Sequence, residues 1–279
     1  MSLKVSLTKI TLILILFLSL QNIVNAQQKS VSPYEWKWGR DGIWTGAALG
    51  ASTYGLLLII NKDDLSEEKF NSLSIDDING IDRWVAGNYS RSASSISDIP
   101  FALAFVAPMA MLFDDEINDH TGQYIGIYLE SLATTAALYS VTAGLVNRSR
   151  PYVYSDKAPM DRRLSNNGQR SFFSGHTAVV ATSTFYTAKV FSDFNPDAKG
   201  KFFVWAGAAA LPAAVGFLRM QAGQHFLTDV ITGYTIGAAV GLLVPELHKR
   251  KEPKLSFYPT SSRTILGDNY NAITINYRF

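Results

Sequence analysis

The sequence has no cysteine, which excludes disulfide bridges, thiolate metal sites and thiol nucleophiles. It has only four histidines, too few for a histidine-rich metal site, and we expect neither a metal ion nor a cofactor. The formal net charge is +2 and the basic residues are scattered, so we expect no nucleic-acid partner. Any chemistry must come from a small set of histidine, arginine and carboxylate side chains.

Residues 1–26 have the features of a secretory signal peptide. Lys4 and Lys9 flank the start of an apolar run over residues 10–20, and a small-residue cleavage site ends at Ala26. The alternative is an uncleaved anchor, although the apolar run is short for a membrane span. Both interpretations place the protein in the membrane or beyond it.

The rest of the chain is dominated by apolar segments, at residues 42–60, 99–113, 122–146, 172–190, 202–218 and 227–246. These segments are rich in small residues, which let helices approach closely inside a bilayer. A tightly packed soluble or peripheral bundle has the same composition. We predict an all-α bundle of about six apolar helices, embedded in a membrane.

The sequence divides into four predicted regions: the signal peptide 1–26, an N-terminal apolar helix with an amphipathic loop region 27–97, a helical core 98–248, and a β-like tail 249–279. Within the loop region, residues 81–88 predict an interfacial helix. In the tail, Ile273 and Ile275 alternate with polar residues, as in a half-buried strand. The tail is long enough for a hairpin and too short for a barrel.

Three polar clusters lie at the ends of apolar segments: Arg148-Ser149-Arg150-Pro151, Ser174-Gly175-His176, and Arg219 with His225 and Asp229. Each cluster alone has an ordinary explanation, such as a helix cap or a surface ion pair. Together they supply what cleavage of a phosphate ester requires. These requirements are stabilised charge, an oriented nucleophile and a proton for the leaving oxygen.

Arginines and a helix start are the predicted phosphate contacts. Arg150 and Arg219 offer planar forks of donors that keep their charge at any working pH. Ser174 and Gly175 precede an apolar helix, so their backbone amides lie at a helix N-terminus, which attracts anions.

The histidines are the predicted reacting groups. His225 and Asp229 are four residues apart at the start of the last apolar helix, so we expect the carboxylate to reach an imidazole nitrogen. Such a carboxylate fixes the tautomer and stabilises a charged ring, which makes His225 the better nucleophile. His176 is left as the acid for the leaving alcohol, and later as the base that activates water.

The clusters resemble the three-part signature of the type 2 phosphatidic acid phosphatase and vanadium haloperoxidase superfamily, over roughly residues 98–246. That signature is Lys, six residues, Arg-Pro; then Pro-Ser-Gly-His; then Ser-Arg, five residues, His, three residues, Asp. The matching residues are Arg150-Pro151, Ser174-Gly175-His176, and Arg219 with His225 and Asp229. The resemblance implies that His225 is the nucleophile, His176 the acid and Asp229 the orienting carboxylate. It also implies phosphate contacts from Arg150, Arg219, Ser174 and Gly175.

Three positions depart from the signature: Ala143 replaces its Lys, Phe173 its second Pro, and Leu218 its Ser. The missing Lys matters most, because loss of a cation from the phosphate costs about 1–3 kcal/mol of transition-state binding unless another cation replaces it. The candidate replacements are Arg148, the nearest in sequence, and Lys157, Arg162 and Arg163. The alternative for Arg148 is a solvated loop charge.

The order of helices and clusters resembles the lipid-phosphatase branch of the superfamily. This implies metal-independent hydrolysis of lipid phosphate or pyrophosphate esters through a phospho-histidine intermediate, with the lipid substrate and the membrane as partners. The alternatives are a soluble secreted acid phosphatase acting on small esters, a haloperoxidase using vanadate, and a catalytically weakened membrane binding or scaffold protein.

The side of the membrane is predicted from conflicting signals. A cleaved signal peptide followed by six spans would place the clusters in the cytoplasm. The basic residues after the last helix favour a cytoplasmic C-terminus instead: Lys249, Arg250, Lys251 and Lys254. We expect a protein of the cell-envelope membrane with an extracytoplasmic, periplasmic site, and expect segment 99–113 to be the one that does not span.

Overall fold

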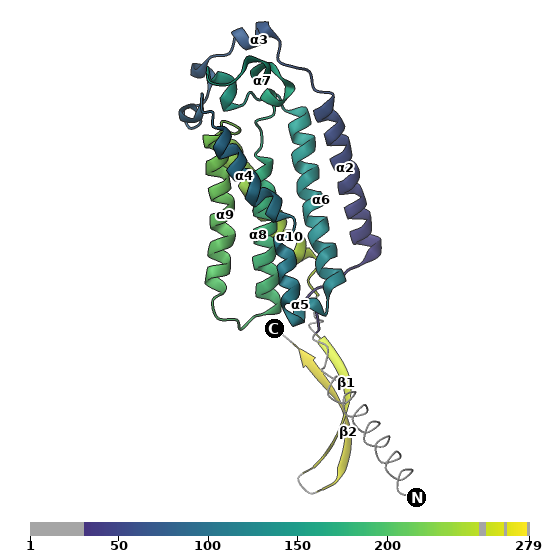
Figure 1. Ribbon diagram of the computed structural model, residues 1–279. Helices are drawn as coiled ribbons and strands as arrows, with labels where there is room; N and C mark the ends of the chain where they lie inside the picture. Colours follow the sequence, from purple (N-terminus) through teal and green to yellow (C-terminus); the bar gives the residue numbers. More distant parts are fainter. Residues whose placement is uncertain (1–30, 251–254, 265–266, 278–279) are drawn as a thin grey trace, which may run out of the picture.

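A computed structural model describes residues 31–250, 255–264 and 267–277 of the chain. The expected signal peptide lies outside the described residues. The described chain forms a bundle of long helices, with a two-stranded hairpin extending from one end (Figure 1). The predicted helical bundle with a short β tail is confirmed.

Six long helical segments build the bundle in the described chain: α2 (Ile43–Ile60), α4 (Arg91–Ala104) continued by η4 (Ala107–Phe113), α6 (Thr121–Leu145), α8 (Gly175–Phe194), α9 (Lys201–Gln221) and α10 (Leu227–Leu247). Each overlaps one predicted apolar segment. Helix α4 begins earlier than predicted because the Ser90 hydroxyl caps it, accepting a hydrogen bond from the Ala93 amide at 3.2 Å.

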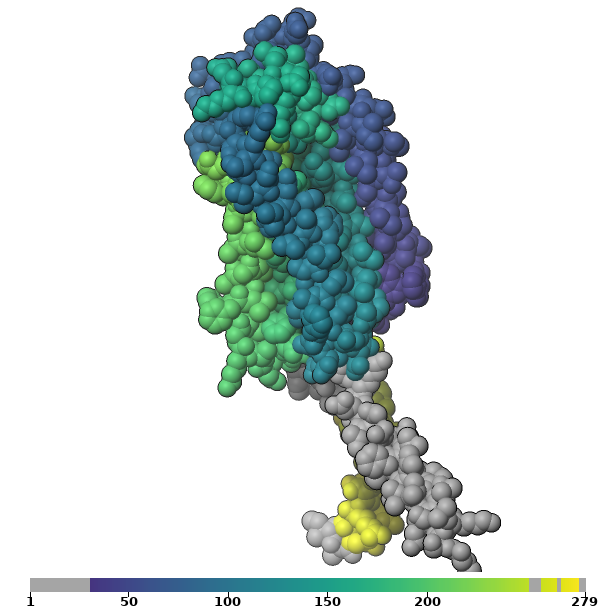
Figure 2. Space-filling view, in the orientation of Figure 1, coloured from purple at the N-terminus to yellow at the C-terminus, as the bar shows by residue number. Residues whose placement is uncertain are grey.

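Short helices and loops form a cap over one end of the bundle. The cap comprises residues 61–90 and 151–170, with α3 (Glu67–Asn71), η2 (Ile75–Asp77), η3 (Arg83–Val85), η5 (Pro151–Tyr154), α7 (Met160–Leu164) and η6 (Asn166–Gln169). Its two segments are joined by a 2.7 Å hydrogen bond from the Leu65 amide to the Leu164 carbonyl. Figure 2 shows them as one continuous surface. Of the interfacial helix and loop predicted around residues 81–88, the helix is only the three-residue 3₁₀ turn η3, and Gly87 follows it with a φ of 82°.

The opposite end of the bundle carries η1 (Trp38–Gly42), α5 (Asp115–Asn118) and the hairpin. Strands β1 (Leu255–Arg263) and β2 (Asn269–Tyr277) pair in antiparallel register, with Pro259 opposite Ile273. The hairpin predicted for the tail is therefore confirmed.

Four stretches of the described chain are long and apolar enough to cross a membrane: Trp38–Ile60, Arg91–Phe113, Lys201–Gln221 and Leu227–Leu247. Large apolar side chains on α2 face outward, including Leu49, Leu56 and Ile60. An apolar exterior over a closed helical bundle is the arrangement of a membrane protein. Residues 99–113, predicted not to span, lie within a stretch of sufficient length.

Glycines let α8 and α10 pack in direct backbone contact. A Cβ atom on Gly233 would overlap the Ser174 carbonyl, and one on Gly237 would overlap the Ala178 carbonyl. This spacing of small residues is the one that brings helices close together in membranes. The later glycine contacts the later residue of α8, so the contacts follow the same order along both chains. Helices α8 and α10 therefore run parallel and begin at the same end, beneath the cap.

Candidate active site

The three polar clusters meet beneath the cap, where α6 and α9 end and α8 and α10 begin (Figure 1). Arg150 and Arg219 lie close enough to His176 and His225 to act electrostatically on both rings. The structure therefore brings two guanidiniums and two imidazoles together, as the sequence predicted.

A tight turn between α9 and α10 places His225. Gly223 adopts a φ of 71°, and a Cβ atom there would overlap the Asn88 carbonyl, so only glycine fits. The buried His225 ring directs Nδ1 at the Ser171 carbonyl oxygen, 2.6 Å away. Because a carbonyl can only accept, Nδ1 carries the hydrogen and the neutral ring keeps a free lone pair on Nε2.

The surroundings hold His225 in its neutral form. Burial lowers the pKa of His225 well below its ordinary value, and the charges of Arg150 and Arg219 lower it further. The ring is therefore unprotonated at neutral pH, which is the state in which an imidazole nitrogen acts as a nucleophile.

Asp229 acts on His225 through an intermediate residue. Helix α10 begins at Leu227, so His225 lies outside it, and its Nδ1 is bonded to the Ser171 carbonyl instead of the Asp229 carboxylate that we expected. The Asp229 carboxylate accepts hydrogen bonds from the Ser171 hydroxyl at 2.6 Å and from the Phe226 amide at 2.8 Å. It thereby anchors Ser171, whose carbonyl orients the imidazole.

Arg148 lies between two buried carboxylates. It donates to Asp229, and to Asp82 at 2.6 Å, and its guanidinium stacks over the Phe226 ring at 4.8 Å. The pKa of Asp82 lies below its ordinary value, so the carboxylate stays ionised. Burial alone would raise this pKa, but hydrogen bonds, chiefly from Thr228, lower it by more. Arg148, predicted as a phosphate contact, is thus placed as a link between the cap and α10. Asp82 was not predicted as a site residue, because it lies in an otherwise ordinary polar stretch.

Arg150 and Arg219 are buried, and each has an N–H donor without a hydrogen-bond partner. Arg150 donates to Gln224, and Arg219 donates to Ser97 at 3.3 Å and to Asp98 at 3.4 Å. The Nε atoms of both arginines are buried with no hydrogen-bond partner. Burial also lowers the pKa of Arg150. Burying a guanidinium with unpaired donors costs free energy, and an anion that binds to those donors lowers this cost.

Two further arginines share this property. Arg162 and Arg170 also have a buried Nε atom without a partner. Arg162 acts electrostatically on Arg150 and Arg219, and Arg170 acts on Arg150. Arg162 was one of the predicted replacements for the missing Lys. Arg170 was missed, because it lies in a loop and outside the signature.

His176 and Ser174 occupy the start of α8. Ser174 is the residue before the helix, as predicted, and its hydroxyl pairs with that of Thr177 at 2.8 Å. His176 is held by Asp98, whose carboxylate oxygen lies 2.9 Å from Nε2, and by Phe101, whose ring stacks on the imidazole at 4.0 Å. Asp98 and Phe101 come from α4, and no spacing in the sequence linked them to His176.

An apolar groove begins beside His176. It has a volume of about 360 Å³ and is lined by residues of α2, α4, α6 and α8, among them Leu56, Phe101, Leu132, Ala136 and Val179. Gly175 leaves room for the Tyr139 ring, because a Cβ atom there would lie 2.8 Å from it. The groove thus joins a polar, cationic site to a channel suited to hydrocarbon.

The arrangement combines a neutral imidazole nucleophile, a second imidazole held by a carboxylate, and several incompletely paired guanidiniums. These groups suit transfer of a phosphoryl group, in which positioning and charge stabilisation provide most of the catalysis. Among the described residues, the His, Asp and Glu side chains close enough to hold a metal ion lie elsewhere, at the opposite end of the bundle.

Comparison with known proteins agrees with this arrangement. Residues 124–253 match the model of the PAP2 superfamily. Over 81 residues the chain is 31% identical to the lipid A 4'-phosphatase of Porphyromonas gingivalis, a match that covers 29% of this chain and 31% of that protein.

Two solved structures are similar to the chain. The transmembrane PAP2 type phosphatidylglycerolphosphate phosphatase from Bacillus subtilis has a TM-score of 0.46 and 21% identity, over 72% of this chain and 94% of that one. Aquifex aeolicus LpxE has a TM-score of 0.43 and 19% identity, over 62% of this chain and 99% of that one.

Proposed function

Because residues 124–253 belong to the PAP2 superfamily, we propose that this protein is a membrane phosphatase that hydrolyses lipid phosphate or pyrophosphate esters without a metal ion in its active site. The observation that carries the proposal is the free Nε2 lone pair of a neutral, buried His225 beside incompletely paired arginines. The relative from Porphyromonas gingivalis, named a lipid A 4'-phosphatase, supports a lipid-linked phosphate as substrate.

In the proposed first step, His225 Nε2 attacks phosphorus and the bond from phosphorus to the leaving oxygen breaks. Arg150 and Arg219 neutralise charge on the non-bridging oxygens, together with amides at the start of α8. His176 donates a proton to the leaving oxygen, and Asp98 positions the ring. The product is a phospho-histidine, whose Nδ1–H remains bonded to the Ser171 carbonyl.

In the second step, His176 accepts a proton from water as the water oxygen attacks phosphorus. The bond from phosphorus to Nε2 breaks, inorganic phosphate leaves, and His225 returns to its neutral form. Asp229 serves as a positioning residue here, since it holds Ser171 and Arg148 in place. The active-site groups end each cycle in their starting protonation states, so no cofactor is needed.

We infer that Arg162 supplies the cation missing at Ala143. Replacing Arg162 with glutamine is expected to lower kcat/KM for phosphate release by about 10- to 100-fold, in line with the loss of about 1–3 kcal/mol of charge stabilisation. Arg163 is the matched control, because it lies beside Arg162 in α7 and donates to the Val153 carbonyl at 2.8 Å. If Arg163→Gln lowers kcat/KM as much as Arg162→Gln does, the loss comes from a disturbed fold of the cap and not from a missing cation.

The apolar groove supports a lipid substrate over a small ester. An Ala136→Trp substitution would fill the groove, and kcat/KM for a long-chain lipid phosphate should fall more than about tenfold, since displacing two methylenes costs about 1.6 kcal/mol. Hydrolysis of a water-soluble phosphate ester, assayed with chelator present, should be unchanged. Leu138→Trp, on the exposed side of the same helix, is the control. Equal losses on both substrates would contradict the assignment of the groove.

We propose that the site faces the extracytoplasmic side. Lys37, Arg40, Lys249 and Arg250 gather at the opposite end of the bundle, as expected for a cytoplasmic face. The absence of native cysteine allows a direct test by single substitutions at exposed positions. A membrane-impermeant maleimide should label Glu68→Cys, in the cap, in intact cells, and should label Asp197→Cys only after lysis. The reverse pattern would place the site in the cytoplasm.

A further inference from the structure

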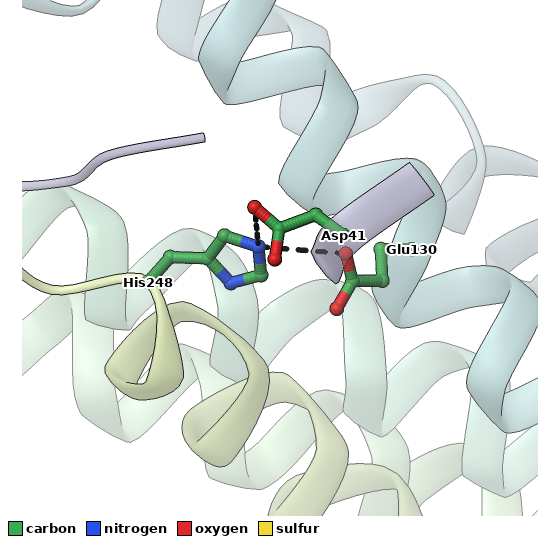
Figure 3. Close-up of side chains that lie close together, drawn as sticks. All are labelled: Asp41, Glu130 and His248. Carbon is green, nitrogen blue, oxygen red and sulfur yellow. Dashed lines mark ion pairs between the residues drawn. The ribbon is translucent and has the colours of Figure 1, made fainter. Parts of the chain in front are cut away.

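A second cluster of buried ionisable side chains lies at the end of the bundle away from the cap. Asp41 comes from η1, Glu130 from α6 and His248 from the residue after α10, and the three side chains converge (Figure 3). Their exposed fractions are 1%, 4% and 1%. Helix α10 separates this cluster from the active site by roughly 30 Å, at about 1.5 Å per residue.

The tautomer of His248 directs a lone pair at the two carboxylates. Its Nδ1 donates to the Val244 carbonyl at 2.8 Å, so in the neutral ring Nε2 has no hydrogen. Backbone carbonyls orient metal-binding histidines in the same way. Nε2 lies 3.3 Å from Asp41 Oδ2 and 3.4 Å from Glu130 Oε2 (Figure 3).

These separations suit ligands that share one metal ion. Charge-assisted hydrogen bonds between nitrogen and oxygen are shorter, at about 2.7–2.9 Å. Ligands placed tetrahedrally at about 2.0–2.1 Å from a metal ion lie about 3.3–3.4 Å apart. In the described structure, both Nε2 of His248 and Oε2 of Glu130 are buried without a hydrogen-bond partner. One ligand atom from each of the three residues lies within 4.8 Å of the others.

The charge of the cluster also favours a cation. Asp41 is paired with Arg40 and accepts a hydrogen bond from the Lys37 amide at 2.6 Å. With a neutral His248 ring, as a metal ligand must have, the carboxylate of Glu130 is then excess negative charge. Burying an uncompensated charge is costly, and a divalent cation removes that cost.

We propose that Asp41, Glu130 and His248 bind a divalent first-row metal ion, with Zn²⁺ and Mn²⁺ as the leading candidates for one nitrogen and two carboxylate ligands. The site is structural, because it fastens the segment before α2 to α6 and to the end of α10. The same segment is already tied there by the Glu35 amide, which donates to the His248 carbonyl at 2.8 Å. Trp36 stacks on the His248 ring at 5.6 Å and covers the site.

Purified tag-free protein in detergent provides the test. After treatment with chelator and dialysis against Zn²⁺ or Mn²⁺, elemental analysis should find about one metal ion per chain. Loading should raise Tm by about 5 °C, as expected for a ligand present at about 100 times its Kd. Phosphate release at 25 °C should not change with loading, since the two sites are far apart.

Variants separate metal binding from folding. Glu130→Gln and His248→Gln should abolish both the bound metal and the Tm shift while retaining phosphate release, which reports a folded bundle. Glu246→Gln is the matched control, because this carboxylate is half exposed near His248 and pairs with Lys189. The proposal is overturned if folded wild-type protein binds neither ion, which would leave a protonated His248 between two carboxylates. It is also overturned if the variants bind metal as the wild type does.

Discussion

Replacing His225 with alanine should lower kcat for phosphate release by at least about three orders of magnitude, because removal of the attacking atom leaves only binding and charge stabilisation. The effect should fall on kcat, since Arg150 and Arg219 still bind the phosphate. KM should change little. The measurement is phosphate release from a lipid phosphate, in detergent, with chelator present.

His120 provides the control for this substitution, because it precedes α6 at the end of the bundle away from the cap. His120→Ala should keep activity within about threefold of wild type, as expected for a position outside the site. Activity of His225→Ala near the wild-type level would remove the nucleophile assignment. A similar loss in both variants would instead indicate damage to the fold.

Replacing Arg150 with lysine should lower kcat/KM by about 100-fold or more, although the charge is retained. The planar guanidinium can donate two parallel hydrogen bonds to a phosphate, whereas an ammonium group acts as a single point charge. Loss of one well-placed donor to developing charge costs about 100- to 1000-fold. Because Arg150 is buried and its Nε has no partner, no solvent or side chain replaces the lost donor.

Arg83 is the control for the lysine substitution, since it lies in the cap and donates to the Asp76 and Ile78 carbonyls. Arg83→Lys should leave kcat/KM within about threefold of wild type. Inorganic phosphate should also inhibit the Arg150→Lys enzyme more weakly than the wild type. The reason is that the phosphate group of the bound substrate and free phosphate contact the same guanidinium. Unchanged inhibition would show that Arg150 does not contact phosphate.

Most of the fold could be predicted because apolar runs mark helices directly. Each of the six segments predicted from hydrophobicity overlaps a helical segment of the bundle, and the alternation at Ile273 and Ile275 marked strand β2. The prediction failed where short-range polar contacts decide the structure. The start of α4 depends on the Ser90 cap, and the turn near Gly87 prevents a helix at residues 81–88.

The members of the site could be predicted, but not all of their contacts. Arg150, His176, Arg219 and His225 lie together because fixed spacings put them at helix ends. The spacing of His225 and Asp229 was misleading, since it carries structural meaning only if both residues are helical.

Contacts between distant segments leave no periodic signal in a single sequence. Asp82 binds Arg148, Asp98 binds His176, and Ser171 binds His225, each across a long separation in the chain. The Asp41, Glu130 and His248 cluster is hidden for the same reason, because its three members lie far apart in the sequence. A count of histidines alone argued against a metal site, whereas the site proposed at this cluster needs only one histidine.

The central claim, that His225 attacks phosphorus, is tested most directly by trapping the intermediate. In a His176→Ala variant the water-activating base is missing, so the phosphorylated enzyme should accumulate when an activated phosphate ester with a good leaving group is supplied. Rapid quenching in base, followed by peptide mass spectrometry, should find an acid-labile phosphate on His225. Absence of label on His225 while the activated ester is still being hydrolysed, or label on another residue, would contradict the account.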